Sequence, residues 1–255
     1  MNTERYSRQI MLDEIGEEGQ RKIGAISVLV VGVGGLGSAI CPYLVAAGIG
    51  SLTIVDADAV SVNNLQRQIL FREQQVGMSK ALEARRNLQK LNSEVRIKAF
   101  PEAFTPENAV EFVRDVDIVI DATDNFKTRY LINDVCVGLD KPFIYGAISE
   151  FSGQLAVFNC NQKSTYRCLF PDDEEMIASQ KHVVGVFGVL PGIIGCLQVN
   201  EVIKWATQCG TLLNDKLFCL NLQNNQTFSV DISPSAAARN KAMENFQQNI
   251  ISWNN

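Results

Sequence analysis

A run of apolar, mostly β-branched residues that ends in glycines is the feature that most restricts the fold of this chain. Residues 26–33 are ISVLVVGV, and the glycines continue through Gly37. A continuous apolar run is typical of a strand buried on both faces of a parallel sheet, and the glycines permit a tight turn into a helix. We therefore expect a strand, a glycine turn and a helix over residues 36–47, the first unit of a nucleotide-binding α/β fold.

Later apolar runs extend this unit into a doubly wound sheet. Runs separated by helix-length segments predict parallel strands at 51–56, 95–100, 117–122 and 142–148. Further runs predict antiparallel strands at 153–159, 216–222 and 226–232. The expected fold class is α/β, with a Rossmann-like, doubly wound, mainly parallel sheet, an antiparallel extension and an irregular crossover loop over 166–181.

The length of 255 residues favours a single domain with one sizeable core. Within it we expect N-terminal helices over 1–25, a nucleotide-binding core over 26–150, and a sheet extension with a glycine-rich helix over 151–255. A terminal amphipathic helix over 235–253 is expected to dock on its own domain through Phe246, Ile250 and Ile251.

The glycine-rich helix is expected to present one face of small residues. Glycines recur at spacings of three and four, and the apolar stretch around them continues to about Ala206; they are Gly185, Gly188, Gly192 and Gly195. Such a face allows close packing against another backbone, in the same chain or at a dimer contact.

The glycine turn supplies the first candidate ligand residues. Gly32, Gly34 and Gly37 satisfy GxGxxG at a strand-to-helix junction, where a nucleotide can approach the backbone and helix N–H groups face its phosphates. Asp56 ends the next strand, nineteen residues after Gly37, a separation suited to an acid that binds a ribose. An NAD-dependent oxidoreductase fits these residues equally well.

The residues after Asp56 favour a triphosphate instead. The chain places close together Asn63, Asn64, Gln66, Arg67 and Gln68, and Lys80 follows soon after. Arginine offers a planar fork of donors and lysine a compact charge, so the pair is suited to stabilise charge on a departing pyrophosphate.

Acids beyond the fourth parallel strand are candidates for binding magnesium. The segment DATDN places Asp121, Asp124 and Asn125 where open α/β sheets bind ligands. Magnesium commonly takes one or two protein carboxylates, with waters and phosphates completing its shell. We favour Asp124 as the ligand, because Asp121 can instead cap the next helix.

Five motifs in this order resemble the ThiF/MoeB/HesA family, which is related to the ubiquitin-activating enzymes. The motifs are RYSRQ at 5–9, GVGGLG at 32–37, DADAVSVNNLQRQ at 56–68, Lys80, and DATDN at 121–125. The resemblance covers nearly the whole chain. It implies an ATP- and Mg²⁺-dependent adenylyltransferase acting on a ubiquitin-like sulfur-carrier protein, which the 151–255 region would bind.

The same resemblance implies roles for individual residues. Gly35 approaches the nucleotide and Asp56 binds its ribose. Asn63, Asn64, Arg67 and Lys80 surround the phosphates, and Asp124 and Asn125 serve the metal side. Arg8 reaches in from a partner subunit, which implies a homodimer with composite active sites.

The reaction implied is attack of the carrier's terminal glycine carboxylate on the α-phosphate of ATP, giving an acyl-adenylate and pyrophosphate. A carboxylate is already ionised at neutral pH, so this step requires positioning and charge stabilisation and no general base. The sole histidine, His182, is accordingly expected to be a loop residue without a catalytic role.

The cysteines depart from the family pattern. Many members hold a structural zinc with two CxxC pairs, but here Thr165 stands where a partner of Cys168 would be, and residues 232–240 contain no cysteine. Tetrahedral zinc needs about four Cys or His ligands, so we expect no zinc and a small buried Cys168.

Some relatives carry a cysteine that links covalently to the carrier, and at that approximate place this chain has Gln180, Lys181 and His182. We therefore expect no covalent carrier adduct, with Cys160 and Cys168 the first residues to check, and a separate sulfur donor.

The amino-acid composition limits the classes of partner that this chain is expected to bind. The net charge of −5 and pI near 5.1 disfavour nucleic acids and anionic membranes as partners. No apolar run approaches the roughly 20 residues of a membrane span, and the acidic N-terminus does not resemble a signal sequence, so we expect a cytoplasmic protein.

As the substrate, a thiamine-pathway carrier is favoured over a molybdopterin-pathway carrier. The alternatives are a related enzyme acting on modified tRNA, an NAD-dependent oxidoreductase, and a scaffold without catalysis.

Overall fold

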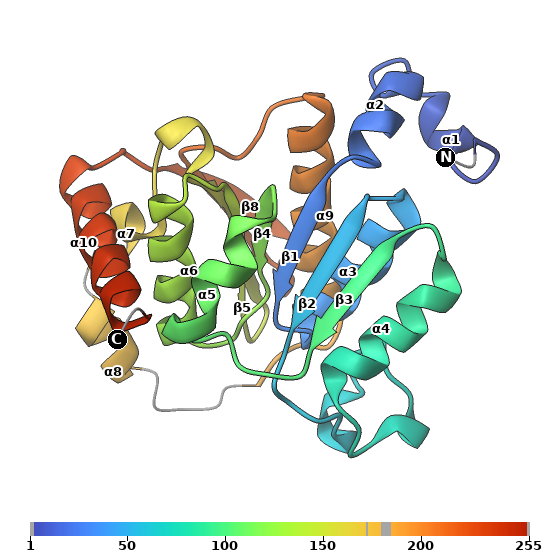
Figure 1. The fold of residues 1–255 in the computed structure, drawn as a ribbon, viewed down its shortest axis with the longest axis horizontal. Coiled ribbons are helices and arrows are strands. Elements are labelled where there is room, and N and C mark those ends of the chain that lie inside the picture. Colours follow the sequence, from blue (N-terminus) through green and yellow to red (C-terminus); the bar gives the residue numbers. More distant parts are fainter. Residues whose placement is uncertain (1–2, 172, 180–184, 254–255) are drawn as a thin grey trace.

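The computed structural model describes residues 3–171, 173–179 and 185–253, and the side chains of 249–253 lie outside this description. Its strands form one eight-stranded sheet in the order β3-β2-β1-β4-β5-β6-β7-β8 (Figure 1). Strands β1 to β5 pair in parallel, and β6 to β8 continue the sheet in antiparallel pairs. The expected fold class is confirmed. The strands are β1 (Ser27–Val31), β2 (Ser51–Val55), β3 (Arg96–Phe100), β4 (Ile118–Asp121), β5 (Phe143–Ser149), β6 (Ser152–Phe158), β7 (Lys216–Asn221) and β8 (Gln226–Asp231).

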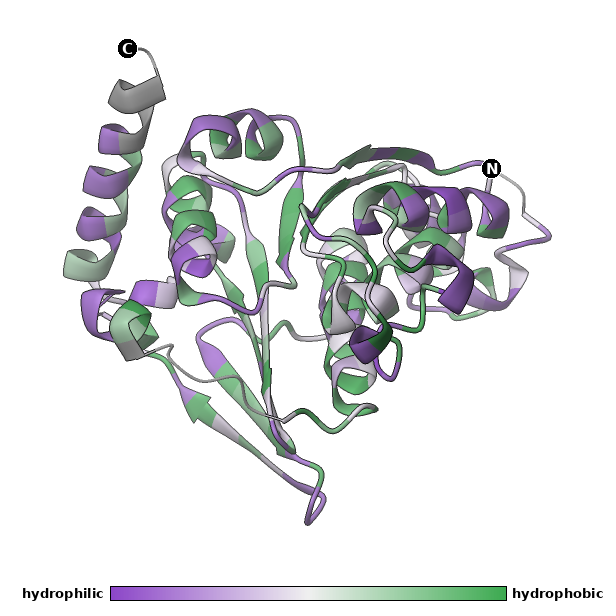
Figure 2. Ribbon diagram, turned by 90° about the horizontal axis from the view of Figure 1, so that it is seen from below, coloured by the Kyte–Doolittle hydropathy of each residue, from purple (hydrophilic) through white to green (hydrophobic). Residues whose placement is uncertain are grey.

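Helices cover both faces of the sheet; its central strands are largely hydrophobic, while the helix at the C-terminus carries many hydrophilic residues (Figure 2). One face carries α3 (Gly35–Ala47), α4 (Lys80–Leu91) and α9 (Leu190–Thr207). The other carries α5 (Pro106–Arg114), α6 (Phe126–Gly138) and α10 (Ala236–Trp253). The shorter helices are α1 (Ser7–Ile10), α2 (Gly16–Ile23), α7 (Tyr166–Leu169) and α8 (Asp173–Ser179), with 3-10 turns η1 (Val62–Asn64), η2 (Glu73–Gln75) and η3 (Cys160–Gln162).

The central strand explains the apolar run that opened the sequence. Val28 and Val30 pack into the core under α3 and α9, while Leu29 and Val31 pack into the opposite core. Successive side chains of a strand point to opposite faces, so a strand covered on both sides must be apolar at every position.

The crossover segment is more regular than expected. Residues 166–181 were predicted to form an irregular loop, but α7 and α8 occupy most of its described part. The buried Arg167 of α7 bonds Asp134 of α6 through two nitrogens at 2.7 Å and Asp173 of α8 at 3.0 Å. Arg167 thus links both short helices to α6, and its pairing with Asp134, 33 residues away, is not predicted by local periodicity.

The glycine-rich helix was placed too early. Gly185 and Gly188 precede α9, which begins at Leu190 with a proline in its first turn. Gly195 does pack closely, because a Cβ there would lie 2.8 Å from the carbonyl oxygen of Leu36 in α3. This close contact of α9 is within the chain.

The C-terminal helix forms as expected and docks on its own chain. Phe246 is buried, and its ring lies where a Cβ on Gly138 of α6 would be. Ile250 and Ile251 lie among the residues whose side chains are not described. Within the described residues, no helix combines the length and apolar character that crossing a membrane requires.

Candidate functional site

The carboxyl ends of β1, β2 and β4 meet around the glycine turn. Gly32 has φ +92°, and a Cβ there would lie 2.7 Å from the carbonyl oxygen of Ala122, just after β4. A Cβ on Gly37 would collide with the carbonyl oxygen of Gly32. Only glycine fits these two positions, so the turn brings bare backbone to the start of α3, where N–H groups face outward.

Asp56 links the end of β2 to this turn. Its Oδ2 accepts a hydrogen bond from the Val33 N–H at 2.7 Å, and its Oδ1 accepts one from the Asp58 N–H at 2.8 Å. Burial raises the pKa of Asp56, although both amide bonds and the charge of Lys80 act to lower it. The carboxylate therefore fixes the turn while staying partly accessible to a ligand.

Lys80 begins α4 and reaches the same edge of the sheet. Ser79 caps this helix by accepting a bond from the Leu82 N–H at 3.4 Å. The Lys80 ammonium lies 2.8 Å from Asp58 Oδ2, and the two side chains are 5% and 71% exposed. A nearly buried cation thus pairs with an acid that remains largely hydrated.

Arg67 lies beside the glycine turn. Its Nη1 donates to the Asn63 carbonyl at 3.3 Å, and its Cδ lies 3.6 Å from where a Cβ on Gly35 would be. Pro191 of α9 is 3.0 Å from that same point. Asn63 and Asn64 form η1 and are joined by a side-chain bond of 3.1 Å. The loop after β2 and the start of α9 therefore enclose the glycine turn.

The acids after β4 have different surroundings. Asp121 is fully buried, accepts from Arg129 Nε at 2.9 Å, and accepts from the amide and hydroxyl of Thr123 at 2.9 and 2.6 Å. The suggestion that Asp121 caps the next helix is wrong, because Asn125 caps α6 by accepting from the Thr128 N–H at 2.8 Å. Asp124 is exposed. Of the two acids, Asp124 is therefore the one that lies at the surface.

Two residues near the turn were not assigned a role from the sequence. Gln68 is 3% exposed, and its Oε1 has no hydrogen-bond partner. Its Nε2 lies 3.5 Å from the Cβ position of Gly34. Asp58 pairs with Lys80, as described. Both residues belong to the motif at 56–68, but only the three-dimensional contacts distinguish them from their polar neighbours.

Arg8 is not part of this cluster within its own chain. It is exposed on α1, and the next residue, Gln9, bonds Gln20 at 2.6 Å, while Gln20 bonds the Ala47 carbonyl at 2.9 Å. Ala47 ends α3, and Gly35 begins it. A helix of 13 residues is about 20 Å long, so α1 lies at the opposite end of α3 from the glycine turn.

The cysteines show no arrangement suited to a metal. Among the described residues, no group of three or more His, Cys, Asp or Glu side chains converges. Cys168 accepts from the Thr165 N–H at 3.3 Å, and it is half-buried where a buried residue was expected. Cys160 is 5% exposed. Gln180, Lys181 and His182 lie outside the described residues.

Comparison with known proteins adds to this geometry. The ThiF family profile matches residues 6–241. The chain is 49% identical over 207 residues to the adenylyltransferase and sulfurtransferase MOCS3-1 of Zea mays, covering 81% of this chain and 44% of that protein, so it spans less than half the length of this relative. It is 47% identical over 207 residues to the sulfur carrier protein adenylyltransferase of Thermus thermophilus, covering 79% and 76% of the two chains.

A solved structure shows a similar fold. E. coli MccB, determined with ATP, aligns with a TM-score of 0.82 over 92% of this chain and 73% of that one, at 24% identity. This likeness concerns the fold alone, while the profile and the two relatives concern the family. The chain belongs to the ThiF family.

Proposed function

We propose that this protein activates the C-terminal glycine carboxylate of a ubiquitin-like sulfur-carrier protein by adenylation with ATP. The observation that carries the proposal is that Arg67 lies beside Gly35 of the bare glycine turn, while Lys80 pairs with Asp58, whose N–H bonds the Asp56 carboxylate that holds the turn. A purely structural turn does not need two cations, whereas a triphosphate does. The names of the Zea mays and Thermus thermophilus relatives support the same chemistry.

The residues present fit a bound ATP. The glycine turn admits phosphates to the N-terminus of α3, and Asp56 is placed to accept a bond from a ribose hydroxyl. Gln68 offers an unpaired buried oxygen beside Gly34, suited to a donor on the nucleotide. Asn63 and Asn64 extend the polar wall beside Arg67.

Magnesium would be held by Asp124, with Asn125 beside it as the cap of α6. When bound, the ion would neutralise phosphate charge.

The protein's own residues contribute charge and position to the adenylation step. A carrier carboxylate oxygen forms a bond to the α-phosphorus while the bond to the bridging oxygen breaks, and pyrophosphate leaves with that electron pair. Lys80 and Arg67 stabilise the negative charge that develops there.

We propose that the active unit is a homodimer in which Arg8 acts on the partner's nucleotide. Its position at the far end of α3 in its own chain supports delivery in trans.

The proposed reaction takes place in the cytoplasm, and its favoured substrate is a thiamine-pathway carrier. A separate donor supplies sulfur without a covalent enzyme–carrier adduct. The burial of Cys160 supports this last point.

Carrier-dependent exchange of labelled pyrophosphate into ATP tests the function. We expect exchange only when a carrier with an intact glycine terminus is present, and faster exchange with a thiamine-pathway carrier than with a molybdopterin-pathway carrier. Exchange supported by modified tRNA, or NAD reduction without exchange, would overturn the proposal in favour of those alternatives.

Mixing two inactive variants tests the composite site. Arg8→Ala and Lys80→Ala are each expected to lose activity, and an equimolar mixture should regain about a quarter of wild-type activity through heterodimers with one intact site. A mixture that stays inactive after subunit exchange contradicts the role of Arg8 in trans.

A further inference from the structure

A buried glutamine of α9 bonds the main chain of two neighbouring strands. Gln198 is 0% exposed. Its Nε2 donates to the Asp121 carbonyl at 2.8 Å and to the Ile144 carbonyl at 3.2 Å. Asp121 ends β4, and Ile144 belongs to β5, so one amide nitrogen joins the two strands to the helix that covers them.

The Gln198 amide lowers the stability of the core that surrounds it. Its Oε1 is buried and has no hydrogen-bond partner in the part of the chain that the structure describes. A Cβ on Gly146 of β5 would lie 2.5 Å from that oxygen and 2.6 Å from Nε2, so the strand has no room for a side chain there. A buried polar atom without a partner destabilises a fold, whereas an apolar residue of the same shape would not. The amide is therefore best explained by the carbonyls that its nitrogen holds.

Close contacts along α9 fix the place of this side chain. A Cβ on Gly195 would lie 2.8 Å from a carbonyl oxygen of α3. On the sheet side, a Cβ on Gly153 of β6 would lie 2.5 Å from Ile194 Cδ1. Because α9 packs this closely against two other elements, Gln198 stands on a rigid support.

The Asp121 carbonyl is the point at which the chain leaves β4 for Asp124. Further along, the Ala122 N–H donates to a β1 carbonyl at 3.0 Å, and the Thr123 N–H donates to the Asp121 carboxylate at 2.9 Å. The bond from Gln198 fixes the first carbonyl of the same segment. The backbone that carries Asp124 is thus held from β1 and from α9.

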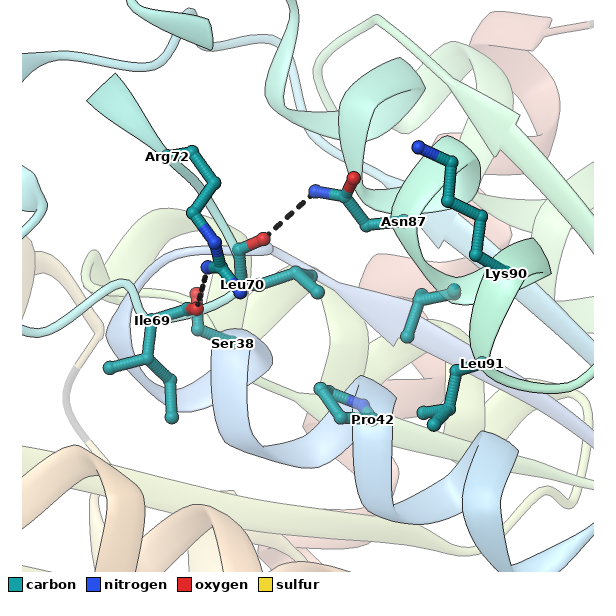
Figure 3. A pocket seen from close by; sticks show the side chains of 9 residues that line it. Ser38, Pro42, Ile69, Leu70, Arg72, Asn87, Lys90 and Leu91 are labelled. Carbon is teal, nitrogen blue, oxygen red and sulfur yellow. Dashed lines mark hydrogen bonds between the residues drawn. The ribbon is translucent and has the colours of Figure 1, made fainter. Parts of the chain in front are cut away.

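Another buried oxygen without a partner offers a contrast. The Ser38 hydroxyl is unpaired within the described residues, and it lines an open pocket of about 420 Å³ between α3, α4 and the segment around residue 70 (Figure 3). Beside it, Arg72 Nη1 and Asn87 Nδ2 donate to carbonyl oxygens of that segment at 2.8 and 2.9 Å. These two bonds join the walls of the pocket to each other. The bonds of Gln198 end instead at the strands that carry the proposed site.

We propose that Gln198 is a positioning residue for the metal side of the nucleotide site. By holding the Asp121 carbonyl against a closely packed helix, it fixes the direction in which the chain leaves β4, and with it the place of Asp124. A segment that is already ordered loses less conformational entropy when a ligand binds. Gln198 acts through the backbone and not by contact with the ligand. This role rests on the proposed function, because Asp124 is the proposed magnesium ligand.

Hydrogen exchange tests the contact without any ligand. In Gln198→Met, whose side chain has a similar length but no donor, the amide hydrogens of Ala122 and Thr123 should exchange at least about tenfold faster than in the wild type. Glu201→Met is the matched control, because Glu201 is also buried on α9 and accepts from the Leu213 N–H at 2.9 Å. It should speed exchange at Leu213 and leave the other two amides unchanged. A folded Gln198→Met with wild-type exchange at both amides overturns the proposal.

The magnesium dependence of carrier-dependent pyrophosphate exchange tests the meaning for catalysis. At saturating ATP, the half-saturating magnesium concentration should rise about fivefold in Gln198→Met, while the KM for the carrier stays within about twofold of wild type. A merely structural loss would reduce the amount of active enzyme and leave both constants unchanged, as expected for Glu201→Met. An active Gln198→Met with the wild-type magnesium constant overturns the positioning.

A milder variant covers the case in which Gln198→Met does not fold. Gln198→Asn keeps an amide that is one methylene shorter and therefore too short for both carbonyl bonds, so exchange at Ala122 and Thr123 should rise about threefold. Unchanged exchange in this variant also overturns the proposal. Faster exchange in the variants, together with a wild type that shows no carrier-dependent pyrophosphate exchange, supports the positioning of the segment after β4 and contradicts the proposed function instead.

Discussion

Two cation–carboxylate pairs lie at the carboxyl edge of the parallel strands, and they differ in how far their side chains are exposed to solvent. Arg129 and Asp121 are 6% and 0% exposed, 2.9 Å apart. Arg129 also donates to the Thr123 carbonyl at 3.0 Å and lies over the rings of Phe126 and Tyr145. In the other pair, Lys80 is nearly buried but its partner Asp58 is 71% exposed.

This difference separates a structural pair from one suited to a ligand. Burial is the largest single influence and opposes the charge of Arg129, but Asp121, Tyr145 and Tyr166 together outweigh it, so the pKa of the guanidinium is raised. That pair has no free side for a substrate. Under the proposed function Lys80 exchanges Asp58 for a phosphate, because a carboxylate that is mostly hydrated loses little when its partner leaves. The comparison predicts that one pair governs stability and the other activity.

Removing Arg129 should have the largest effect, and it should fall on stability. Arg129→Met leaves Asp121 buried without its counter-ion, which typically costs about 3–5 kcal/mol. Urea unfolding followed by circular dichroism measures the loss. Lys127→Met, at an exposed position on the same helix, is the control and should change the free energy of unfolding by less than about 0.5 kcal/mol. A loss as small as the control's would mean that the buried pair is not structural.

Removing Lys80 should reverse this pattern. Lys80→Met takes away a positive charge at the departing pyrophosphate and should slow carrier-dependent adenylation by roughly 100-fold or more. Its cost in stability should stay near 1 kcal/mol or below, because Asp58 remains hydrated. Lys98→Met, at an exposed position on β3, serves as the matched variant in both assays. Full activity in the Lys80 variant would remove the basis for assigning this pair to the nucleotide.

Neutralising Asp58 sharpens the comparison, with a smaller effect. If Asp58 holds the Lys80 ammonium only until phosphate arrives, Asp58→Asn removes a competing anion. We expect the dissociation constant for ATP to fall about threefold, roughly 0.6 kcal/mol, in isothermal titration calorimetry. Weaker ATP binding would show instead that Asp58 is needed to position Lys80.

The sequence predicted the sheet and its glycine turn because those features are local. Apolar residues at every position of β1 report burial on both faces, and Gly32 and Gly37 occupy positions where a side chain collides with backbone. The segment DATDN, by contrast, presents two acids that look alike in the sequence. Arg129 distinguishes them, since it binds Asp121 and leaves Asp124 exposed.

The crossover and the glycine-rich helix were harder to predict for a related reason. Helix α8 is short, and its partner Arg167 also depends on Asp134, far away in the sequence. Gly188 lies before α9 because the loop must pass close to Gln66, whose Oε1 would be 2.5 Å from a Cβ at that position. Both features are fixed by contacts between distant segments, which periodicity does not encode.

The pH dependence of Asp56 extends the comparison to a half-buried carboxyl group that accepts hydrogen bonds from backbone N–H groups. Its pKa is raised in the folded protein, chiefly by burial. A raised pKa means that the folded state favours the protonated form, so the contribution of Asp56 to stability is present below the ordinary pKa of 3.8 and is lost as pH rises through the folded value. Relative to Asp56→Asn, the wild type should therefore become less stable as pH rises over that interval, a smaller change than those above. Urea unfolding of both proteins across this range measures it, with Asp231→Asn, at a side chain 90% exposed, as the control. If the wild type instead became more stable as pH rises, the hydrogen bonds from Val33 and Asp58 would outweigh burial. Asp56 would then stabilise the fold, as Asp121 does, and would not lower stability in order to stay accessible.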